Sequence, residues 1–197
     1  MTVEALNAAA PRYQILGYLD DNFAQLRSTD FPILGGTNAW LSYKGKARLL
    51  AVPGSSRSFR QRRQIIDRFG LGAANAVTIV DPFVRVASSA RIGMNSLIMA
   101  GCFVSAGAIV GDHCVVLPNT VISHDACLRD HVVVGSNVSI SGGVELGENC
   151  YIGSGARIRE GVRIGAGTLV GMGAVVVRDV LPGEVVAGIP ARTIAAG

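Results

Sequence analysis

The chain has 197 residues, of which 49% are hydrophobic, and a formal net charge of +4 at pH 7. This length allows one large or two small domains, and this composition is sufficient for a core. The basic residues are scattered without interleaved aromatic residues, which argues against nucleic acid as a partner. The sequence contains neither a signal peptide nor an apolar run of membrane length, so we expect a cytoplasmic protein with no membrane partner.

The first part of the chain, residues 1–79, is predicted to be a small α/β unit. Strands that alternate with helices favour a parallel sheet. The expected elements are a short helix over residues 2–9, a strand over 13–19, a second strand over 47–52 and a helix over 58–69.

Polar turns follow both predicted strands. Asp20 and Asp21 come directly after the first strand, and Gly54 lies in the Pro-Gly-Ser-Ser turn after the second. Ligands bind at the carboxyl ends of strands in parallel sheets, so these residues could line a substrate pocket. Ordinary turn chemistry explains them equally well.

A strict six-residue period runs from Val80 to residue 181. Val, Ile or Leu leads each of seventeen consecutive hexads, and a small residue follows four positions later, Val180 in the last hexad. This period is typical of a parallel β-helix, in which each hexad is one short strand plus one corner. The lead residues should point inward and stack on those of the next coil, about 4.8 Å away. Corner residues are expected to supply backbone conformations that branched residues resist. They are Gly93, Gly111, Asn119, Gly135, Gly147, Gly153, Gly165 and Gly171.

The four cysteines belong to this pattern. Cys102, Cys114 and Cys150 occupy the small inward position of their hexads, and Cys127 follows one such position. The sequence contains no C-x-x-C motif. We therefore expect buried thiols and neither a disulfide nor a metal set.

This pattern resembles that of the hexapeptide-repeat acyltransferases, and within them the group of sialic acid O-acetyltransferases and nucleotide-sugar N-acetyltransferases. The resemblance implies a mainly β protein: a left-handed parallel β-helix with three hexads in each triangular coil, preceded by a small, incomplete Rossmann-like α/β domain. The left hand rests on the resemblance alone, because general crossover rules favour the opposite hand. The motifs that carry it are Tyr18-Leu19-Asp20-Asp21, Ser88-Ser89-Ala90-Arg91-Ile92-Gly93, Leu97-Ile98-Met99-Ala100-Gly101, Ile122-Ser123-His124-Asp125, Ser141-Gly142-Gly143-Val144 and Gly188-Ile189-Pro190-Ala191-Arg192.

The resemblance also implies a division of the chain. Residues 1–79 would bind substrate, residues 80–181 would form the acetyltransferase solenoid, and residues 182–197 would close the coil and contact CoA. Members of this group usually open with a strand and a glycine-rich turn, whereas this chain begins at the first helix. Either the start site is misassigned, the chain is trimmed, or the turn has been lost. Its absence weakens the prediction of a nucleotide sugar, because its amides would be natural phosphate ligands.

His124 and Asp125 are the candidate catalytic pair. Acyl transfer to an amine or hydroxyl needs a base that titrates near neutrality. The resemblance makes His124 the general base and Asp125 the residue that orients the ring and raises its basicity. With three hexads per coil, Gly142 lies one coil above His124, and the resemblance implies that its amide polarises the acetyl carbonyl. Without the resemblance, both positions are plain corners.

The resemblance further implies an acetyl-CoA groove between neighbouring subunits of a homotrimer. Two departures limit what the resemblance implies. Val133 stands where many relatives have a histidine that contacts acetyl-CoA, and Leu117 stands where an asparagine is common, with Asn119 nearby. The acceptor pocket is therefore expected to differ from theirs. The candidate cofactor-binding residues are Gly142, Gly143, Ser154, Met172, Pro190 and Arg192.

His113 and His131 are 18 residues apart, so they should stack in one column. A stacked pair with a third histidine could bind zinc, as in a carbonic-anhydrase-like branch of this fold. The spacing does not resemble that branch, and solvated corners explain the pair. We therefore predict no metal site.

The leading functional hypothesis is an acetyl-CoA-dependent acetyltransferase acting on the amino group of a nucleotide-linked amino sugar in bacterial glycan biosynthesis. No serine or cysteine is placed as an acyl carrier, so direct attack on the thioester is expected. One alternative is O-acetylation of a sugar hydroxyl. Another is a non-catalytic or metal-binding β-helix protein. The sequence does not identify the sugar or the nucleotide.

Overall fold

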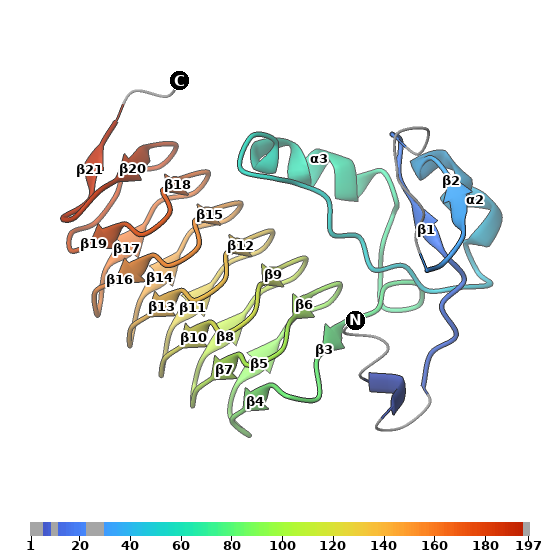
Figure 1. Cartoon of the computed structure of the whole chain (residues 1–197), viewed down its shortest axis with the longest axis horizontal. Coiled ribbons are helices and arrows are strands. Elements are labelled where there is room, and N and C mark those ends of the chain that lie inside the picture. Colours follow the sequence, from blue (N-terminus) through green and yellow to red (C-terminus); the bar gives the residue numbers. More distant parts are fainter. Residues whose placement is uncertain (1–5, 9–11, 23–29, 195–197) are drawn as a thin grey trace.

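The computed structural model describes residues 6–8, 12–22 and 30–194. Figure 1 shows a stack of coils with a smaller N-terminal unit, residues 12–22 and 30–78, against one side. Of the helix predicted over residues 2–9, residues 6–8 are helical, and the rest lies outside the described residues. No helix in the described ranges is long and apolar enough to cross a bilayer.

The N-terminal unit contains a parallel two-stranded sheet and short helices. The predicted α/β character is confirmed, but the first strand is shorter than the predicted range 13–19, and its partner strand was not predicted. The elements are β1 (Tyr18–Leu19), β2 (Ile33–Gly35), η2 (Thr37–Ala39), α2 (Trp40–Tyr43), η3 (Phe59–Gln61) and α3 (Arg62–Asp67). The last two replace the single helix predicted over 58–69.

The predicted strand over residues 47–52 is wrong. This segment has no continuous strand neighbour, and only isolated bridges pair Lys44 with Ala47 and Leu49 with Ala76. Instead, the side-chain amide of Asn95 accepts a hydrogen bond from the Ala51 N–H (2.8 Å) and donates one to the Ala51 carbonyl (3.0 Å). A solenoid side chain therefore satisfies backbone groups that a neighbouring strand would otherwise pair.

The solenoid consists of three parallel sheets, as the six-residue period predicts. Its eight-stranded sheet contains β3 (Ile79–Val80), β6 (Leu97–Ile98), β9 (Val115–Val116), β12 (Val133–Val134), β15 (Tyr151–Ile152), β18 (Leu169–Val170), β20 (Val185–Ala187) and β21 (Arg192–Thr193). Its six-stranded sheet contains β4 (Arg85–Val86), β7 (Phe103–Val104), β10 (Val121–Ile122), β13 (Ser139–Ile140), β16 (Arg157–Ile158) and β19 (Val175–Val176). Its five-stranded sheet contains β5 (Arg91–Ile92), β8 (Ile109–Val110), β11 (Cys127–Leu128), β14 (Glu145–Leu146) and β17 (Arg163–Ile164).

Residues 18 apart lie in adjacent coils. Ile122 pairs in register with Ile140, and both side chains are fully buried in the solenoid core. Backbone hydrogen bonds join the coils, for example from the Val121 N–H to the Val138 carbonyl at 2.9 Å. The branched lead residues thus form the interior of a prism whose three edges are the corners between sheets.

The left-handed backbone conformation at the corners lies at a different position of the hexad from the one predicted. Of the predicted corner set, only Asn119 has a left-handed φ, at 61°. The glycines in that set are required for space, since a Cβ on Gly135 would lie 2.5 Å from the Ser154 nitrogen. The left-handed conformation recurs instead three residues after every lead residue from Ile92 to Val170. It is found at Asn95, Gly101, Gly107, His113, Asn119, Asp125, His131, Asn137, Gly143, Asn149, Gly155, Gly161, Gly167 and Gly173.

The final coil is two residues shorter than the others. Val180 pairs with Ile164, 16 residues earlier, and therefore takes a lead position and not the small position predicted for it. The Gly165 N–H donates to the Val180 carbonyl at 2.9 Å. The register changes in the corner after Val176, and then β20 continues the eight-stranded sheet, with β21 antiparallel to it.

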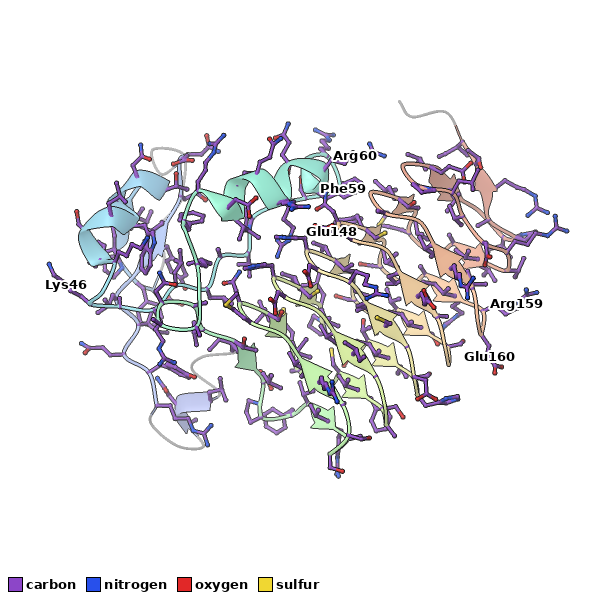
Figure 2. The ribbon with its side chains drawn as sticks, turned by 180° about the vertical axis from the view of Figure 1, so that it is seen from behind. Lys46, Phe59, Arg60, Glu148, Arg159 and Glu160 are labelled. Atoms are coloured by element: carbon purple, nitrogen blue, oxygen red, sulfur yellow. The ribbon has the colours of Figure 1, made fainter. Side chains whose placement is uncertain are left out.

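The N-terminal unit is attached along the edge between the five-stranded and eight-stranded sheets. Figure 2 shows Phe59, Arg60 and Glu148 gathered where the helical segment meets the coils. The Arg60 guanidinium donates to the carbonyls of Gly167 (3.3 Å) and Gly183 (3.1 Å), and the Asn149 amide donates to the Arg60 carbonyl (3.2 Å). These contacts fix the unit to the solenoid.

Candidate active site

His124 and Asp125 lie in the corner between the six-stranded and five-stranded sheets, directly after β10. The His124 Nδ1 and the Asp125 Oδ2 are 3.0 Å apart. The side chains are 62% and 73% exposed, so this edge is open. Asp125 occupies the left-handed corner position, with φ at 58°. The structure therefore forms the histidine–carboxylate pair that the motif predicts.

Gly142 lies against the imidazole ring. A Cβ on Gly142 would lie 2.5 Å from both Cε1 and Nε2 of His124, so only glycine leaves the ring its place. The Gly142 carbonyl accepts a hydrogen bond from the Gly161 N–H at 3.0 Å. Within residues 6–8, 12–22 and 30–194, the Gly142 N–H has no hydrogen-bond acceptor.

This arrangement joins a base to a free backbone donor. Because Asp125 occupies Nδ1, the other ring nitrogen, Nε2, is available to accept a proton. The free N–H of Gly142 in the next coil can stabilise an oxyanion that forms beside this nitrogen. The corner therefore offers a candidate general base and a candidate oxyanion donor.

Four of the six predicted cofactor-binding residues fall on two different edges. Gly143 follows Gly142 and donates its N–H to the His124 carbonyl at 3.0 Å. Ser154 and Met172 follow β15 and β18, on the edge between the eight-stranded and six-stranded sheets. Met172 is 81% exposed. One chain alone does not bring these two groups together.

Pro190 and Arg192 lie in the C-terminal segment. Both are exposed, and β21 begins at Arg192. The neighbouring Ala191 N–H donates to the Val175 carbonyl at 2.8 Å, which holds the segment against the end of the six-stranded sheet.

Asp21 lines a cavity of about 510 Å³ in the N-terminal unit. Its Oδ1 accepts hydrogen bonds from the Thr37 N–H (2.7 Å) and hydroxyl (2.9 Å), which lower the pKa of Asp21. Asp20 instead accepts from the Asn22 N–H at 2.8 Å, as in a tight turn. Gly54 is not among the residues that line the cavity, so the structure does not gather the three predicted residues.

Most of this cavity wall was not predicted from the sequence. Thr37 follows β2, which was not predicted, although Gly35-Gly36-Thr37 after an apolar pair was a usable turn signal. Other missed lining residues come from the helices. They are Asn38, Trp40, Leu41, Gln61, Gln64, Ile65, Arg68 and Phe69.

His113 and His131 stack as predicted, with ring centroids 4.7 Å apart and planes inclined by 15°. The prediction that they are solvated is wrong, because the N-terminal unit covers them: His131 is 6% exposed, and Arg62 donates to the His113 carbonyl at 2.7 Å. Burial lowers the pKa of both histidines. In the described part of the chain, no group of three His, Cys, Asp or Glu side chains could hold a metal ion.

Cys102, Cys114 and Cys150 are buried free thiols, as predicted, but the prediction is wrong for Cys127, a free thiol in β11 that is only partly buried. Burial raises the pKa of Cys114 to about 12 and that of Cys150 to about 11. Since the thiolate is the nucleophile, these cysteines are poor acyl carriers.

A triangular hexapeptide solenoid with a histidine–carboxylate pair on one edge defines the class of left-handed β-helix acyltransferases. A family model described as the GMPPB C-terminal domain matches residues 74–164. The acetyltransferase domain of PglB from Neisseria gonorrhoeae, solved with acetyl coenzyme A, is 30% identical, with coverage of 98% of this chain and 93% of that one and a TM-score of 0.81. This chain belongs to the hexapeptide-repeat acetyltransferase family.

A second relative is GDP-perosamine N-acetyltransferase from Caulobacter crescentus, of which a histidine variant was solved with CoA and GDP-perosamine. It is 27% identical, with coverage of 99% of this chain and 91% of that one and a TM-score of 0.86. WeeI from Acinetobacter baumannii, at 21% identity, 97% and 92% coverage and a TM-score of 0.76, shares the fold. No curated protein sequence matches the chain.

Proposed function

We propose that this protein transfers the acetyl group of acetyl-CoA to the amino group of a nucleotide-linked amino sugar in bacterial glycan biosynthesis. The observation that carries the proposal is the His124–Asp125 pair beside the free N–H of Gly142. The ligands of the Caulobacter and Neisseria relatives support the co-substrate and the class of acceptor. In this proposal residues 1–79 bind substrate, 80–181 form the catalytic solenoid, and 182–197 close the coil and contact CoA.

In the proposed reaction His124 is the general base and Asp125 holds its ring. The amine nitrogen attacks the thioester carbonyl carbon, and the His124 Nε2 accepts the proton that the nitrogen loses. Negative charge develops on the carbonyl oxygen, and the Gly142 N–H stabilises it by about 3 kcal/mol, the usual contribution of such a donor. When the carbon–sulfur bond breaks, the carbonyl forms again and the imidazolium returns its proton to the CoA sulfur.

Three of the four cysteines support direct transfer. Cys102, Cys114 and Cys150 are buried, and the pKa of each is raised by burial, so none of these three is poised to carry the acetyl group. Both substrates would therefore be bound at once. All four cysteines are free, which is usual in a reducing compartment, and we propose a cytoplasmic location.

A homotrimer would complete the acetyl-CoA site. The edge with Ser154 and Met172 in one copy would face the edge with His124 in the next, and Pro190 and Arg192 would contact the cofactor near the end of the coil.

The six-stranded sheet lies between these two edges and exposes apolar side chains, Phe103 at 44% and Val121 at 40%. Burial of such a surface favours association. A measured mass in solution tests this arrangement, and an active monomer would exclude it.

The cavity beside Asp21 is the proposed site for the nucleotide. Asp21 offers a carboxylate and Arg68 a cation on the same wall, a combination that suits the donors of a base and the charge of a phosphate. Asp20 and Gly54 would shape the adjacent turns.

The test is acetyl transfer by the purified protein to GDP-, UDP-, dTDP- and CMP-linked amino sugars. The free thiol of the CoA product is measured as the readout. Each amino sugar is paired with its hydroxyl analogue, because O-acetylation uses the same base. We expect release with an amino sugar and a loss of about 10²–10⁴-fold in His124→Ala at an unchanged thermal midpoint. Equal turnover in His124→Ala would refute the role of the histidine. Absence of acetyl-CoA binding would favour a non-catalytic solenoid, and bound metal a metal protein.

A further inference from the structure

Gly107 lies one coil below Asp125, 18 residues earlier. A Cβ on Gly107 would overlap the Asp125 Oδ1 and lie 3.4 Å from the Asp125 Cγ. The carboxylate thus occupies the space that a side chain at position 107 would take. The Gly107 N–H is not part of this contact, because it donates to the Ser89 hydroxyl at 3.1 Å.

The carboxylate has few other restraints. Its Oδ2 contacts the His124 Nδ1 at 3.0 Å, and in the described part of the chain no other group donates a hydrogen bond to it. The Asp125 backbone is fixed by its left-handed φ and by the hydrogen bond from its N–H to the Ala106 carbonyl at 3.0 Å. With the backbone fixed, the position of the carboxylate depends on the free space over Gly107.

We propose that Gly107 is a positioning residue for the reaction, because its missing side chain lets the Asp125 carboxylate lie against the coil below while it holds the His124 ring. This inference rests on the proposed function. The dyad is then bracketed by two positions without side chains: Gly107 beneath the carboxylate and Gly142 against the imidazole.

The left-handed backbone at Gly107, with φ at 70°, does not by itself explain the glycine. Asparagine adopts the same conformation at the equivalent position of four other hexads, on the other two edges, at Asn95, Asn119, Asn137 and Asn149. Asparagine tolerates left-handed φ because its short polar side chain can bond locally. The requirement at Gly107 is space for the Asp125 carboxylate, just as Gly101 leaves space for the Asn119 side chain one coil above it.

Gly161 provides a matched control on the same edge. It lies three coils above Gly107 in the same column, has a φ of 69°, and a Cβ on it would meet nothing within 4 Å. Gly107→Asn and Gly161→Asn therefore make the same chemical change at equivalent backbone positions. They differ in whether the new side chain meets the Asp125 carboxylate.

The experiment compares kcat and KM of the two variants with those of the wild-type protein. We expect Gly107→Asn to lower kcat at least tenfold with little change in KM, since the lost interaction orients the base and does not bind substrate. Gly161→Asn should stay within twofold. Equal losses in the two variants, or wild-type kcat in Gly107→Asn, would overturn the proposal.

A double-mutant cycle separates positioning from general damage to the coil. In an Asp125→Gly background the carboxylate is gone and the left-handed position remains acceptable, so Gly107→Asn should change kcat less than twofold. A further tenfold loss in that background means that position 107 acts independently of Asp125. If Gly107→Asn does not fold, Gly107→Ala with Gly161→Ala repeats the comparison with a smaller side chain.

A spectroscopic readout keeps this inference distinct from the proposed function. Nitrogen NMR of the His124 ring should show an altered Nδ1 signal in Gly107→Asn and an unaltered one in Gly161→Asn. This result holds even if no acetyl transfer is found, which would be a failure of the proposed function alone. An unaltered Nδ1 signal in both variants contradicts the positioning role.

Discussion

His131 stacks on His113 at 4.7 Å between ring centroids, in the interface that joins the N-terminal unit to the solenoid. The Nδ1 of His131 is buried and has no hydrogen-bond partner in the described part of the chain. Burial lowers the pKa of both rings; Arg62 and, for His131, the neighbouring His113 add to this effect. Carboxylates nearby oppose it, namely Asp67, Asp112, Asp130 and Glu148. The net effect lowers the pKa of both rings, which favours their neutral form in the folded protein.

This interface should weaken in acid. In the unfolded chain a histidine has a pKa of about 6.5 and binds a proton more readily than in the fold, so the free energy of unfolding decreases as pH falls below that value. The stabilising contribution of the two neutral histidines to the free energy of unfolding is fully present above about pH 6.5. Denaturant unfolding at pH 7 and pH 5 measures the change.

The matched variant for this test is His113→Asn with His131→Asn. Asparagine already occupies the coils on either side in this column, at Asn95 and Asn149, with the same left-handed φ. The double variant should therefore fold and lose less stability between pH 7 and pH 5 than the wild-type protein. Parallel pH profiles would mean that these rings do not titrate on unfolding.

The solenoid could be predicted from sequence because its contacts repeat every 18 residues, so one rule places the lead residues from Ile98 to Val176 inside. Val86, in the first coil, is 41% exposed. The N-terminal unit has no repeat. Its segment around Ala51 is held by the side chain of Asn95, 44 residues away, which no local pattern reveals. Likewise Val180 fits the six-residue period in sequence, but the shortened coil moves it to a lead position.

Asn95 is predicted to stabilise the docking of the N-terminal unit. Asn95→Gly keeps the left-handed backbone and leaves both polar groups of Ala51 unpaired in a buried place, which should lower the free energy of unfolding by about 2 kcal/mol or more. Asn137→Gly is the control, because Asn137 has a φ of 57° and an exposed side chain. Denaturant unfolding of both variants gives the comparison. Equal decreases in the free energy of unfolding in Asn95→Gly and Asn137→Gly would mean that the flexible glycine backbone alone causes the effect.

The candidate site also has one part that the sequence predicts and one that it does not. His124 and Gly142 lie in one corner column and Asp125 lies in the adjacent column, so the motif and the 18-residue spacing were enough to bring them together. Thr37 and the helical wall around Asp21 depend on how short elements pack, and the sequence did not reveal them.

Thr37 is predicted to tune the charge of Asp21. Its N–H and its hydroxyl both donate to the carboxylate and lower the pKa of Asp21. Thr37→Val removes the hydroxyl and keeps the N–H, so the pKa of Asp21 should rise part of the way towards its usual value. Thr37→Ser, which retains a hydroxyl, should leave the pKa unchanged. Carbon NMR titration of the Asp21 carboxyl measures both, and an unchanged pKa in Thr37→Val would rule out the hydroxyl as a cause.

Gly142 is predicted to be essential for turnover for a steric reason as well as for its N–H. Gly142 is not among the left-handed corners, so alanine fits its backbone, but the new Cβ would lie 2.5 Å from the His124 Cε1 and Nε2. The ring must move, and a displacement of about 1 Å commonly costs about 100-fold in rate. Glu160→Ala, one coil above in the same column, is the control and should stay within twofold. Kinetics of acetyl transfer should thus separate the two variants, and a Gly142→Ala protein with wild-type kcat would show that the imidazole does not act from the position it has here.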